Sequence, residues 1–467
     1  MQGLEDLERR VERDLTLTSY PSRDWLLPRT TREGQPVLDV LIVGGGQSGL
    51  ATAFGLMRER VTRILVLDQN AADRAGPWLN FARMKTLRTP KHVTGPDLGL
   101  PSLTIQAWWE AQHGEGSWAE VGLIPKESWA AYLAWYRRVL DIPVRAQTTA
   151  GAIEWLEDEG CFAVPADTPG QPTERLFARR VVLATGIEGS GDWYVPAFVA
   201  KALPRERYAH TRWDIDFGAL RGKRVGVLGA GASAFDNASV ALETGAASVD
   251  LFFRRPKLVD VNAYRWAEFV GFLRHVGDLP DADRWRFIRQ IVRMGQLPPT
   301  DTHARATQHP NFALHPGSPW TDLALDGDEI VVTTPGGQHR LDFVIVGTGF
   351  RTDLGKRPEL ANIVEHISTW SDHYTPPAED SHEDLLRHPY LGPSFEFVAR
   401  DEAAAPWLGR VHNYTFGCLL SLGFGGASIS GMKYSIPRLV GGLTRSLFAE
   451  DKDAYFDSLA AYDTAEF

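Results

Sequence analysis

The sequence is poor in cysteine and contains no long apolar run. Its 467 residues include only two cysteines, Cys161 and Cys418, which lie far apart and form no CxxC pair. Flavoprotein reductases that relay electrons through a dithiol need a close cysteine pair, so the sequence argues against a thiol relay. No apolar stretch approaches the roughly 18 residues of a membrane helix, and the charged amino-terminal segment does not resemble a signal peptide. We therefore expect a cytoplasmic protein with no membrane association.

Basic patches and the common hydrolase and metalloenzyme motifs are also missing. The formal net charge is -10, and no long block of like charge interrupts the chain, which argues against a nucleic-acid partner. There is no convincing GxSxG serine, no HExxH and no paired catalytic carboxylate pattern. His303, His309 and His315 share a proline-rich stretch, but their spacing fits no usual zinc site. We predict no bound metal and a small organic substrate.

The sequence does contain the same glycine-rich fingerprint twice. Each copy, VLIVGGGQSG and RVGVLGAGASA, follows an apolar run and precedes a helix-compatible segment. A sharp turn from strand to helix directs backbone amides at a pyrophosphate, and glycine allows the close approach. The key positions are Gly44, Gly46 and Gly49 in the first copy and Gly229, Gly231 and Ala234 in the second. Two dinucleotide-binding sites are predicted.

The charge that follows each fingerprint differs. The first is followed by Asp68 at the end of RILVLD, and the second by Arg254 and Arg255 at the end of VDLFFRR. A carboxylate accepts hydrogen bonds from ribose hydroxyls and repels a phosphate, whereas arginine binds a phosphate. We therefore assign the first site to a dinucleotide with a free ribose and the second to one with a ribose phosphate.

A second repeat lies downstream of each fingerprint. A series of short alternating strands ends in ARRVVLATG, and a comparable series ends in DFVIVGTGF. A strand that ends in small residues lets the backbone approach a cofactor or lets the chain cross between domains. Thr185 and Gly186 in the first turn, and Thr348 and Gly349 in the second, are predicted cofactor contacts.

These features together resemble the two-dinucleotide-domain flavoprotein monooxygenases, which include flavin-containing monooxygenases, Baeyer-Villiger monooxygenases and microbial N-hydroxylases. The resemblance spans roughly residues 39–350. It implies that the first fingerprint binds FAD and the second NADPH, with Trp78 and the LRTPK segment close to the flavin. It also implies reduction of FAD by NADPH, reaction with molecular oxygen to a flavin hydroperoxide, and transfer of one oxygen atom to the substrate.

The chain departs from the pattern of this group at two places. His210 and Trp213 lie in RYAHTRWD, which resembles the stretch before the second fingerprint, but the spacing is short and the FxG of Baeyer-Villiger enzymes is missing. Amine- and sulfur-oxidising members carry an asparagine near the flavin where Arg88 stands here. We take Arg88, Lys91 and His210 as candidate catalytic residues; the alternative for the two loop residues is a solvated basic loop.

The predicted fold is α/β, with two Rossmann-like domains and the NADPH domain inserted into a discontinuous FAD domain. The expected segments are a helical arm (1–37), a first FAD-binding segment (38–216), the NADPH domain (217–336) with a helical insertion at about 262–320, and a second FAD-binding segment (337–467). The inserted helices either roof the active site or form a dimer surface.

The carboxyl-terminal region supplies further candidates. Gly423, Gly425 and Gly426 precede a predicted helix and are expected near the flavin ring. His412, Asn413 and Lys433 are candidate contacts of the substrate or nicotinamide.

The predicted function is an FAD- and NADPH-dependent monooxygenase that uses molecular oxygen on a small substrate. Hydroxylation of a nitrogen or sulfur atom is slightly preferred to Baeyer-Villiger-type oxygen insertion, because the Baeyer-Villiger stretch is incomplete. Two alternatives are an NADPH oxidase or flavin reductase without substrate oxygenation, and a flavin-bound regulatory protein. A homo-oligomer is possible.

Overall fold

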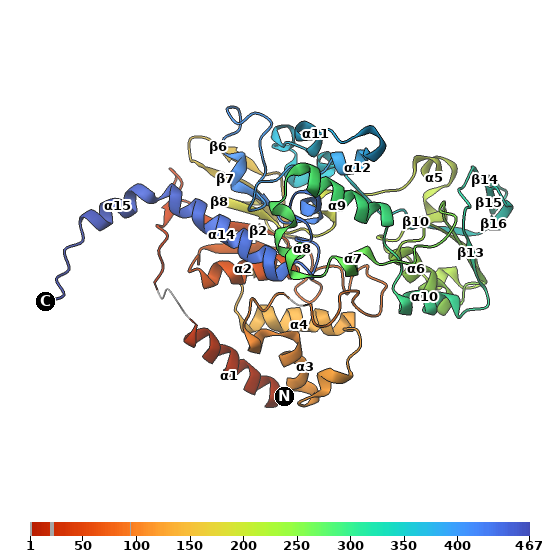
Figure 1. Ribbon diagram of the computed structural model, residues 1–467, viewed down its shortest axis with the longest axis horizontal. Helices are drawn as coiled ribbons and strands as arrows, with labels where there is room; N and C mark the ends of the chain where they lie inside the picture. The colour runs from red at the N-terminus through yellow and green to blue at the C-terminus, as the bar shows by residue number, and fades with distance from the viewer. Residues whose placement is uncertain (1, 19–22, 94) are drawn as a thin grey trace.

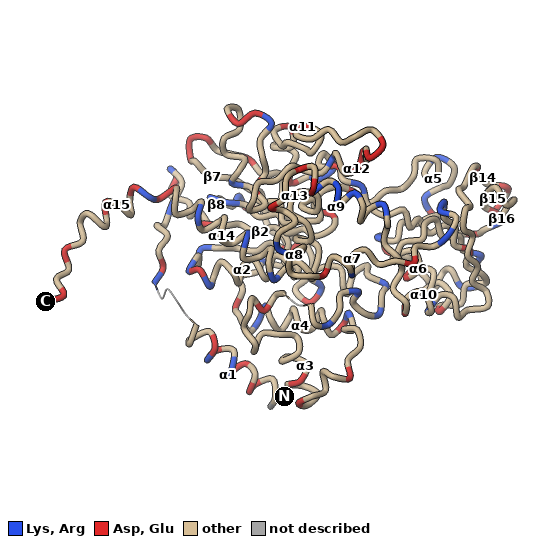
Figure 2. The backbone as a smooth tube through the Cα atoms, in the orientation of Figure 1, with Lys and Arg blue, Asp and Glu red and all other residues tan. Residues whose placement is uncertain are grey.

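The computed structural model describes residues 2–18, 23–93 and 95–467. They include a large mixed sheet in the middle of an elongated molecule and a smaller parallel sheet towards one end (Figure 1). Mixed α/β layering with two such sheets confirms the expected fold class. Basic and acidic positions are interspersed along the chain, with no long run of one sign (Figure 2). Within the described residues, no helix has the length and apolar character needed to cross a bilayer.

The first sheet carries the first fingerprint. Its parallel strands follow the order β4 (Val144–Arg145), β3 (Ile64–Leu67), β2 (Pro36–Val43), β8 (Glu174–Leu183) and β19 (Val411–Asn413). Antiparallel additions come from β1 (Arg29–Thr30), β5 (Thr149–Ala150), β6 (Glu154–Leu156) and β7 (Cys161–Asp167). Since β19 pairs with β8 across more than 200 residues, the chain returns to this sheet after forming the second one.

The second sheet carries the second fingerprint and is wholly parallel. Its order is β10 (Tyr208–His210), β17 (Phe343–Val346), β11 (Arg224–Leu228), β12 (Ser248–Phe252) and β13 (Phe312–His315). The first and last strands in sequence, β10 and β17, lie outside the expected range 217–336. Boundaries drawn at those residues cut the sheet, because β10 and β17 pair with each other and β17 also pairs with β11.

The remaining strands form two smaller sheets. An antiparallel meander consists of β14 (Asp322–Asp326), β15 (Glu329–Thr334) and β16 (Gly337–Leu341). The two segments that connect the halves of the molecule meet as β9 (Gly191–Trp193) and β18 (Phe350–Thr352), an antiparallel pair.

The longer helices cover the sheets and form the amino-terminal layer. They are α1 (Gln2–Leu17), α2 (Gln47–Arg58), α3 (Ile105–His113), α4 (Lys126–Val139), α6 (Ala232–Glu243), α9 (Asp281–Met294), α10 (Thr300–Thr307), α14 (Met432–Glu450) and α15 (Lys452–Ala460). The shorter ones are α5 (Ala197–Ala202), α7 (Ala263–Trp266), α8 (Val270–His275), α11 (Trp370–His373), α12 (Glu383–Leu386) and α13 (Leu419–Leu422). The expected amino-terminal arm packs on the body, since Leu7 and Val11 of α1 are buried and α1 lies against α3.

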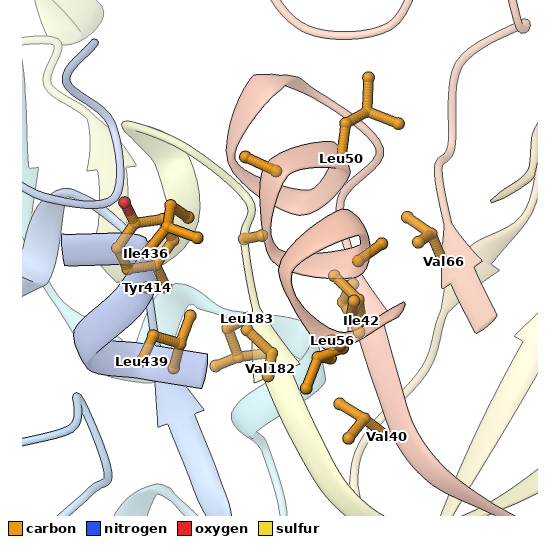
Figure 3. Close-up of a cluster of buried hydrophobic side chains, with 14 of the residues drawn as sticks. Val40, Ile42, Leu50, Leu56, Val66, Val182, Leu183, Tyr414, Ile436 and Leu439 are labelled. Atoms are coloured by element: carbon orange, nitrogen blue, oxygen red, sulfur yellow. The ribbon is translucent and has the colours of Figure 1, made fainter. Parts of the chain in front are cut away.

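The long helix α14, the last but one in the chain, covers the core of the first sheet. It packs against α2, so that the two helices and β8 share one apolar cluster (Figure 3). The labelled members are Val40, Ile42, Leu50, Leu56, Val66, Val182, Leu183, Tyr414, Ile436 and Leu439. A buried ion-pair network holds the far end of this helix, where Arg179 of β8 reaches Asp451 at 3.0 Å and Asp39 of β2 at 3.4 Å. The last helix, α15, projects away from the body (Figure 1).

Truncation of Leu439 should show how much the packing of α14 contributes to stability. Leu439 is fully buried, so Leu439→Ala should lower the free energy of unfolding by about 2–5 kcal/mol through lost burial and the cavity left behind. Urea denaturation of the FAD-loaded protein measures the loss. Leu459→Ala is the matched control, because Leu459 of α15 is 70% exposed and its truncation should change stability by less than about 0.5 kcal/mol. Equal losses in the two variants would contradict this packing.

Candidate functional site

Each fingerprint begins with a glycine that touches the small-Thr-Gly turn of a neighbouring strand. Gly44 has φ +109°, and a β-carbon there would lie 2.5 Å from the carbonyl oxygen of Ala184. Gly229 has φ +122°, and a β-carbon there would clash with the carbonyl oxygen of Gly347. A residue with a side chain is strained at such φ values and has no room here. The two repeats that the sequence shows separately are therefore in contact in both halves.

The third position of each fingerprint explains why one copy tolerates alanine. A β-carbon at Gly49 would clash with the carbonyl oxygen of Gly44, so the first copy needs glycine. In the second copy Ala234 faces Gly347, where a β-carbon would lie 2.8 Å from that of Ala234. The β-carbon of Ala234 therefore packs against the second turn at a point where residue 347 has no side chain.

Both fingerprints open into helices whose first amides have no side-chain cap. Gly46 precedes α2 and Gly231 precedes α6, and neither contributes a capping side chain. Unpaired amides at a helix start, together with the helix dipole, favour a phosphate. Gly231 is exposed, and a β-carbon there would meet no atom within 4 Å. These starts are the expected places for the two pyrophosphates.

Asp68 is fixed at the end of β3 beside the first fingerprint. Its Oδ2 accepts a hydrogen bond from the amide of Gly45 at 2.7 Å, and its Oδ1 accepts one from the amide of Asn70 at 2.7 Å. Each carboxylate oxygen retains a further lone pair for a ribose hydroxyl. This position agrees with the predicted role in binding the FAD ribose.

Two buried polar atoms at the first site have no hydrogen-bond partner among the described residues. They are Nε1 of Trp78 and Oγ1 of Thr185. The Trp78 indole lies beside Gly76, which in turn approaches Gly46 at the start of α2, and Thr185 lies in the turn that touches Gly44. Buried donors are normally satisfied, so both atoms fit a bound ligand that accepts hydrogen bonds, as the phosphates and ribityl oxygens of FAD do.

The two arginines that follow the second fingerprint are placed differently. Arg255 donates from Nη1 to the carbonyl of Met294 at 3.0 Å and from Nη2 to that of Arg293 at 3.2 Å, at the end of α9. Arg254 is exposed, and none of the described residues forms a hydrogen bond or an ion pair with its side chain. The guanidinium that is free to bind a ribose phosphate is therefore that of Arg254, whereas that of Arg255 holds a helix end.

The second turn is held by hydrogen bonds from the connecting segment. The carbonyl of Gly349 accepts from the amide of Tyr194 at 3.0 Å, and Thr348 Oγ1 donates to the carbonyl of Tyr194. In the first turn, the carbonyl of Gly186 accepts from the amide of Phe416 at 3.1 Å. Gly186 and Gly349 both adopt positive φ. The predicted contacts Thr185, Gly186, Thr348 and Gly349 therefore lie directly after β8 and β17, in turns that hydrogen bonds to other segments hold in place.

His210, a candidate catalytic residue, is buried and engaged within the protein. Its Nδ1 accepts from the amide of Arg212 at 3.1 Å, so the proton is assigned to Nε2, which donates to the carbonyl of Gly349 at 3.2 Å. Burial lowers the pKa of His210 to about 4. The ring is neutral at physiological pH, and it positions the second turn.

The other two candidate catalytic residues lie in the long loop after β3. Arg88 donates to the Oδ2 of Asp236 on α6 at 2.9 Å, and Lys91 donates to the carbonyl of Trp118 at 2.7 Å. Asp236 is buried, and this burial raises the pKa of its carboxyl group. Arg88 therefore pairs with an acid of the second fingerprint helix, and both Arg88 and Lys91 are engaged by other parts of the protein.

The same loop makes further ion pairs with the second half of the molecule. Lys85 reaches Glu243 of α6 at 3.1 Å, and Arg305 of α10 donates to both Glu243 and the carbonyl of Arg83. Side-chain hydrogen bonds from Arg305 lower the pKa of Glu243 to about 2. Sequence reasoning missed Asp236 and Glu243; two acids on the fingerprint helix opposite a basic loop were the available signal.

The carboxyl-terminal glycine loop closes over the start of α2. Ser48 donates to the carbonyl of Gly426, and a β-carbon at Gly426 would clash with the carbonyl of Thr415. Lys433, at the start of α14, is exposed. His412 and Asn413 are buried in internal hydrogen bonds, His412 with the carbonyl of Ser394 at 2.8 Å and Asn413 with Ser190 at 3.3 Å. Lys433 is thus the most accessible of these three candidates.

The helices inserted after the second fingerprint lie on this glycine loop. Tyr264 of α7 stacks on Phe424 with ring centroids 5.2 Å apart, and Ser430 donates to Glu268 at 3.1 Å. Helices α7 to α9 share an apolar cluster with Trp370 and Leu420, whereas α10 packs on α6. The insertion therefore covers the expected flavin side, as a roof would, although Trp266 and Phe269 remain about half exposed.

Comparison with known proteins agrees with these sites. A family model described as FAD-NAD(P)-binding matches residues 41–188, and one described as L-lysine 6-monooxygenase/L-ornithine 5-monooxygenase matches residues 118–270. An FAD-dependent urate hydroxylase from Xanthomonas campestris pv. campestris is 44% identical over 467 residues, which cover 100% of this chain and 97% of the relative. The chain belongs to this family of flavin-dependent monooxygenases.

Solved structures share the fold of this monooxygenase at low identity. The ornithine hydroxylase of Pseudomonas aeruginosa superposes with a TM-score of 0.67 and 16% identity, covering 88% of this chain and 100% of that one. The Kutzneria ornithine N-hydroxylase gives 0.66, with 16% identity and the same coverage of both chains. The predicted enzyme class and the cofactor classes, FAD and NAD(P), are confirmed, while the individual site residues stay predictions.

Cofactor preference should depend on Arg254. If its guanidinium binds the ribose phosphate, Arg254→Ala should weaken NADP⁺ binding by about 1.5–3 kcal/mol, the typical worth of a charged hydrogen bond. Binding of NAD⁺, which lacks that phosphate, should be nearly unchanged. Calorimetric titration of the FAD-loaded protein with both dinucleotides measures the difference. Arg255→Ala is the matched control and should not discriminate between them; equal losses for both dinucleotides in Arg254→Ala would refute the assignment.

The neutral state of His210 predicts a pH dependence of stability. The folded-state pKa of about 4 lies below the ordinary value of 6.5, so protons bind the unfolded chain more readily in this window. Stability is therefore present above about pH 6.5 and is lost as pH falls towards 4, by up to about 3 kcal/mol from this residue. Urea denaturation at several pH values between 4 and 7 measures the free energy of unfolding, and the slope of this free energy against pH should be shallower in His210→Gln. His113→Gln, at an exposed position, should retain the wild-type slope, and an unchanged slope in His210→Gln would contradict the assignment.

Proposed function

We propose that this monooxygenase hydroxylates urate or a closely related purine-like heterocycle, with NADPH as the reductant. The supporting observation is the 44% identity to an FAD-dependent urate hydroxylase along the whole chain. That similarity runs through the inserted helices and the glycine loop, which cover the expected flavin side. The sequence alone slightly favoured hydroxylation of a nitrogen or sulfur atom in an unspecified substrate. The similarity supports a narrower proposal, with one class of substrate.

The second candidate is N-hydroxylation of an amino acid amine. It is favoured by the match to the L-lysine/L-ornithine monooxygenase model, but this match ends at residue 270. It therefore leaves out α8, α9 and the loop around Gly426, the elements expected to contact a substrate. The solved N-hydroxylase structures are 15–16% identical to this chain and support the fold alone.

The groups at the site suit a flat heterocycle. Tyr264 and Phe424 form a stacked aromatic pair on the glycine loop, and the exposed Lys433 supplies a positive charge next to the start of α14. An aromatic surface and a positive charge on the same carboxyl-terminal stretch suit a planar, anionic ring such as urate. Glu268 lies at the same loop, and its burial raises the pKa of the carboxyl group.

The protein has three tasks in such a reaction. Trp78, Thr185 and the helix starts hold FAD, which when bound supplies the oxygen-activating redox chemistry. Arg254 and the start of α6 hold NADPH, and His210 fixes the turn through Gly349. The roof of inserted helices excludes water from the reacting centre. The balanced reaction consumes one NADPH, one proton and one O₂ and yields NADP⁺, water and the hydroxylated substrate.

Turnover of urate tests this proposal directly. With the FAD-loaded protein, urate should accelerate NADPH consumption and disappear in a 1:1 ratio to NADPH, with little hydrogen peroxide released. L-Ornithine, L-lysine and a cyclic ketone are the comparison substrates. Acceleration by an amino acid alone would support N-hydroxylation, and acceleration by the ketone alone would support oxygen insertion. NADPH consumption that yields only hydrogen peroxide with every substrate would indicate an oxidase.

A further inference from the structure

A cluster of three potential metal ligands lies on the second sheet, on the face that packs against the meander β14–β16 and opposite the face that α6 covers. Asp250 of β12, His315 of β13 and His339 of β16 each present one ligand atom, and these atoms all lie within 4.8 Å of one another. In the sequence they are separated by 65 and 24 residues, and no local motif announces them. The histidine pattern noted in the sequence, 303, 309 and 315, contributes only its last member.

The strand pairing explains why the three side chains meet. In the parallel pair of β12 and β13, Phe252 is directly opposite His315, so their side chains share a face of the sheet. Asp250 lies two residues before Phe252 and points to that same face. The Oδ1 of Asp250 and the Nε2 of His315 are 2.7 Å apart. The meander strand β16 brings His339 onto this face.

One aromatic ring supports both imidazoles. His315 stacks on Phe252 with ring centroids 4.5 Å apart, and His339 packs edge-on against Phe252 at 4.8 Å and against His315 at 4.7 Å. Phe252 is itself fully buried. All three ligands therefore come from strands and are oriented by packing, which lowers the cost of ordering them around an ion.

The ligand chemistry selects a class of metal. Two imidazole nitrogens and one carboxylate oxygen suit Zn²⁺ and similar transition metals, whereas Ca²⁺ and Mg²⁺ prefer oxygen ligands alone. Zinc bonds to such atoms are about 2.0–2.2 Å long, so ligand atoms around one ion lie roughly 3–4 Å apart. The three ligand atoms lie within 4.8 Å of one another, and the hydrogen-bonded Asp250–His315 pair, at 2.7 Å, has to open slightly to admit the ion. Asp250 and His315 are each about one-fifth exposed, which leaves solvent access for a fourth ligand.

We propose that Asp250, His315 and His339 form a binding site for Zn²⁺ or a similar divalent transition metal, with water in the remaining position. The ion joins the edge of the dinucleotide-binding sheet to the meander β14–β16 and stabilises their contact. Its place outside both cofactor sites makes it a structural site, and it is independent of the substrate of the enzyme.

Metal retention by matched variants tests the proposal. The FAD-loaded protein of 467 residues, free of any affinity tag, is stripped with a chelator and dialysed against Zn²⁺, and bound metal is quantified by atomic emission. We expect one Zn²⁺ per chain, with no competition from excess Mg²⁺. His339→Gln and Asp250→Asn remove one ligand each. Because loss of a ligand's hydrogen-bond partner alone weakens metal binding roughly 10–100-fold, loss of the ligand itself should weaken Zn²⁺ binding by about 100-fold or more.

The chain offers a close control. His275 and Asp278 form a second histidine–carboxylate pair at 2.9 Å, but among the residues that the structure describes no third ligand joins them. His275→Gln should retain one Zn²⁺ per chain. Failure of the unaltered protein to retain Zn²⁺, or equal retention by His339→Gln, would overturn the proposal. The partly exposed His339 position decides the outcome if Asp250→Asn folds poorly.

Discussion

The structure depends on one close backbone contact that occurs twice. In each half, the first glycine of the fingerprint touches the carbonyl at the end of the neighbouring strand, Ala184 in one case and Gly347 in the other. No residue with a β-carbon fits at that point, and the contact fixes where the strand ends relative to the start of the helix. That relation determines where the helix amides, the turn glycines and the following ribose-binding residue lie. The positions of both cofactor sites therefore depend on a glycine, which has no side chain, at the start of each fingerprint.

The two halves are held together by charge as well as by the chain crossings. A basic loop from the first half supplies Lys85 and Arg88 to Glu243 and Asp236 of the helix that carries the second fingerprint. Asp236 is buried, so an unpaired carboxylate there would be costly, and Arg88 compensates it. A loop whose sequence suggests direct contact with flavin or substrate is thus also an element that orients one cofactor domain against the other.

The inserted helices extend from the second domain to the expected active site. They leave the second domain directly after the predicted ribose-phosphate arginines and come to lie on the glycine loop of the first domain, where Tyr264 stacks on Phe424. Arg254, the predicted NADPH contact, and Tyr264, which lies on the expected substrate side, are therefore close together in the sequence. The similarity to a urate hydroxylase runs through both.

The sequence by itself determined the fold class and predicted two dinucleotide sites, because glycine spacing and the charge after each fingerprint act over a few residues of local backbone. The monooxygenase class was predicted from the resemblance of these motifs to a known family. Only the tertiary structure decided which arginine is free, since Arg255 is engaged by α9. It also decided that His210 is a buried, neutral positioning residue, since the carbonyl to which its Nε2 donates belongs to Gly349, 139 residues away in the sequence. The domain limits and the Asp250–His315–His339 cluster were also beyond the sequence. Parallel pairing joins strands distant in the chain, and local patterns carry no record of which strands will be neighbours.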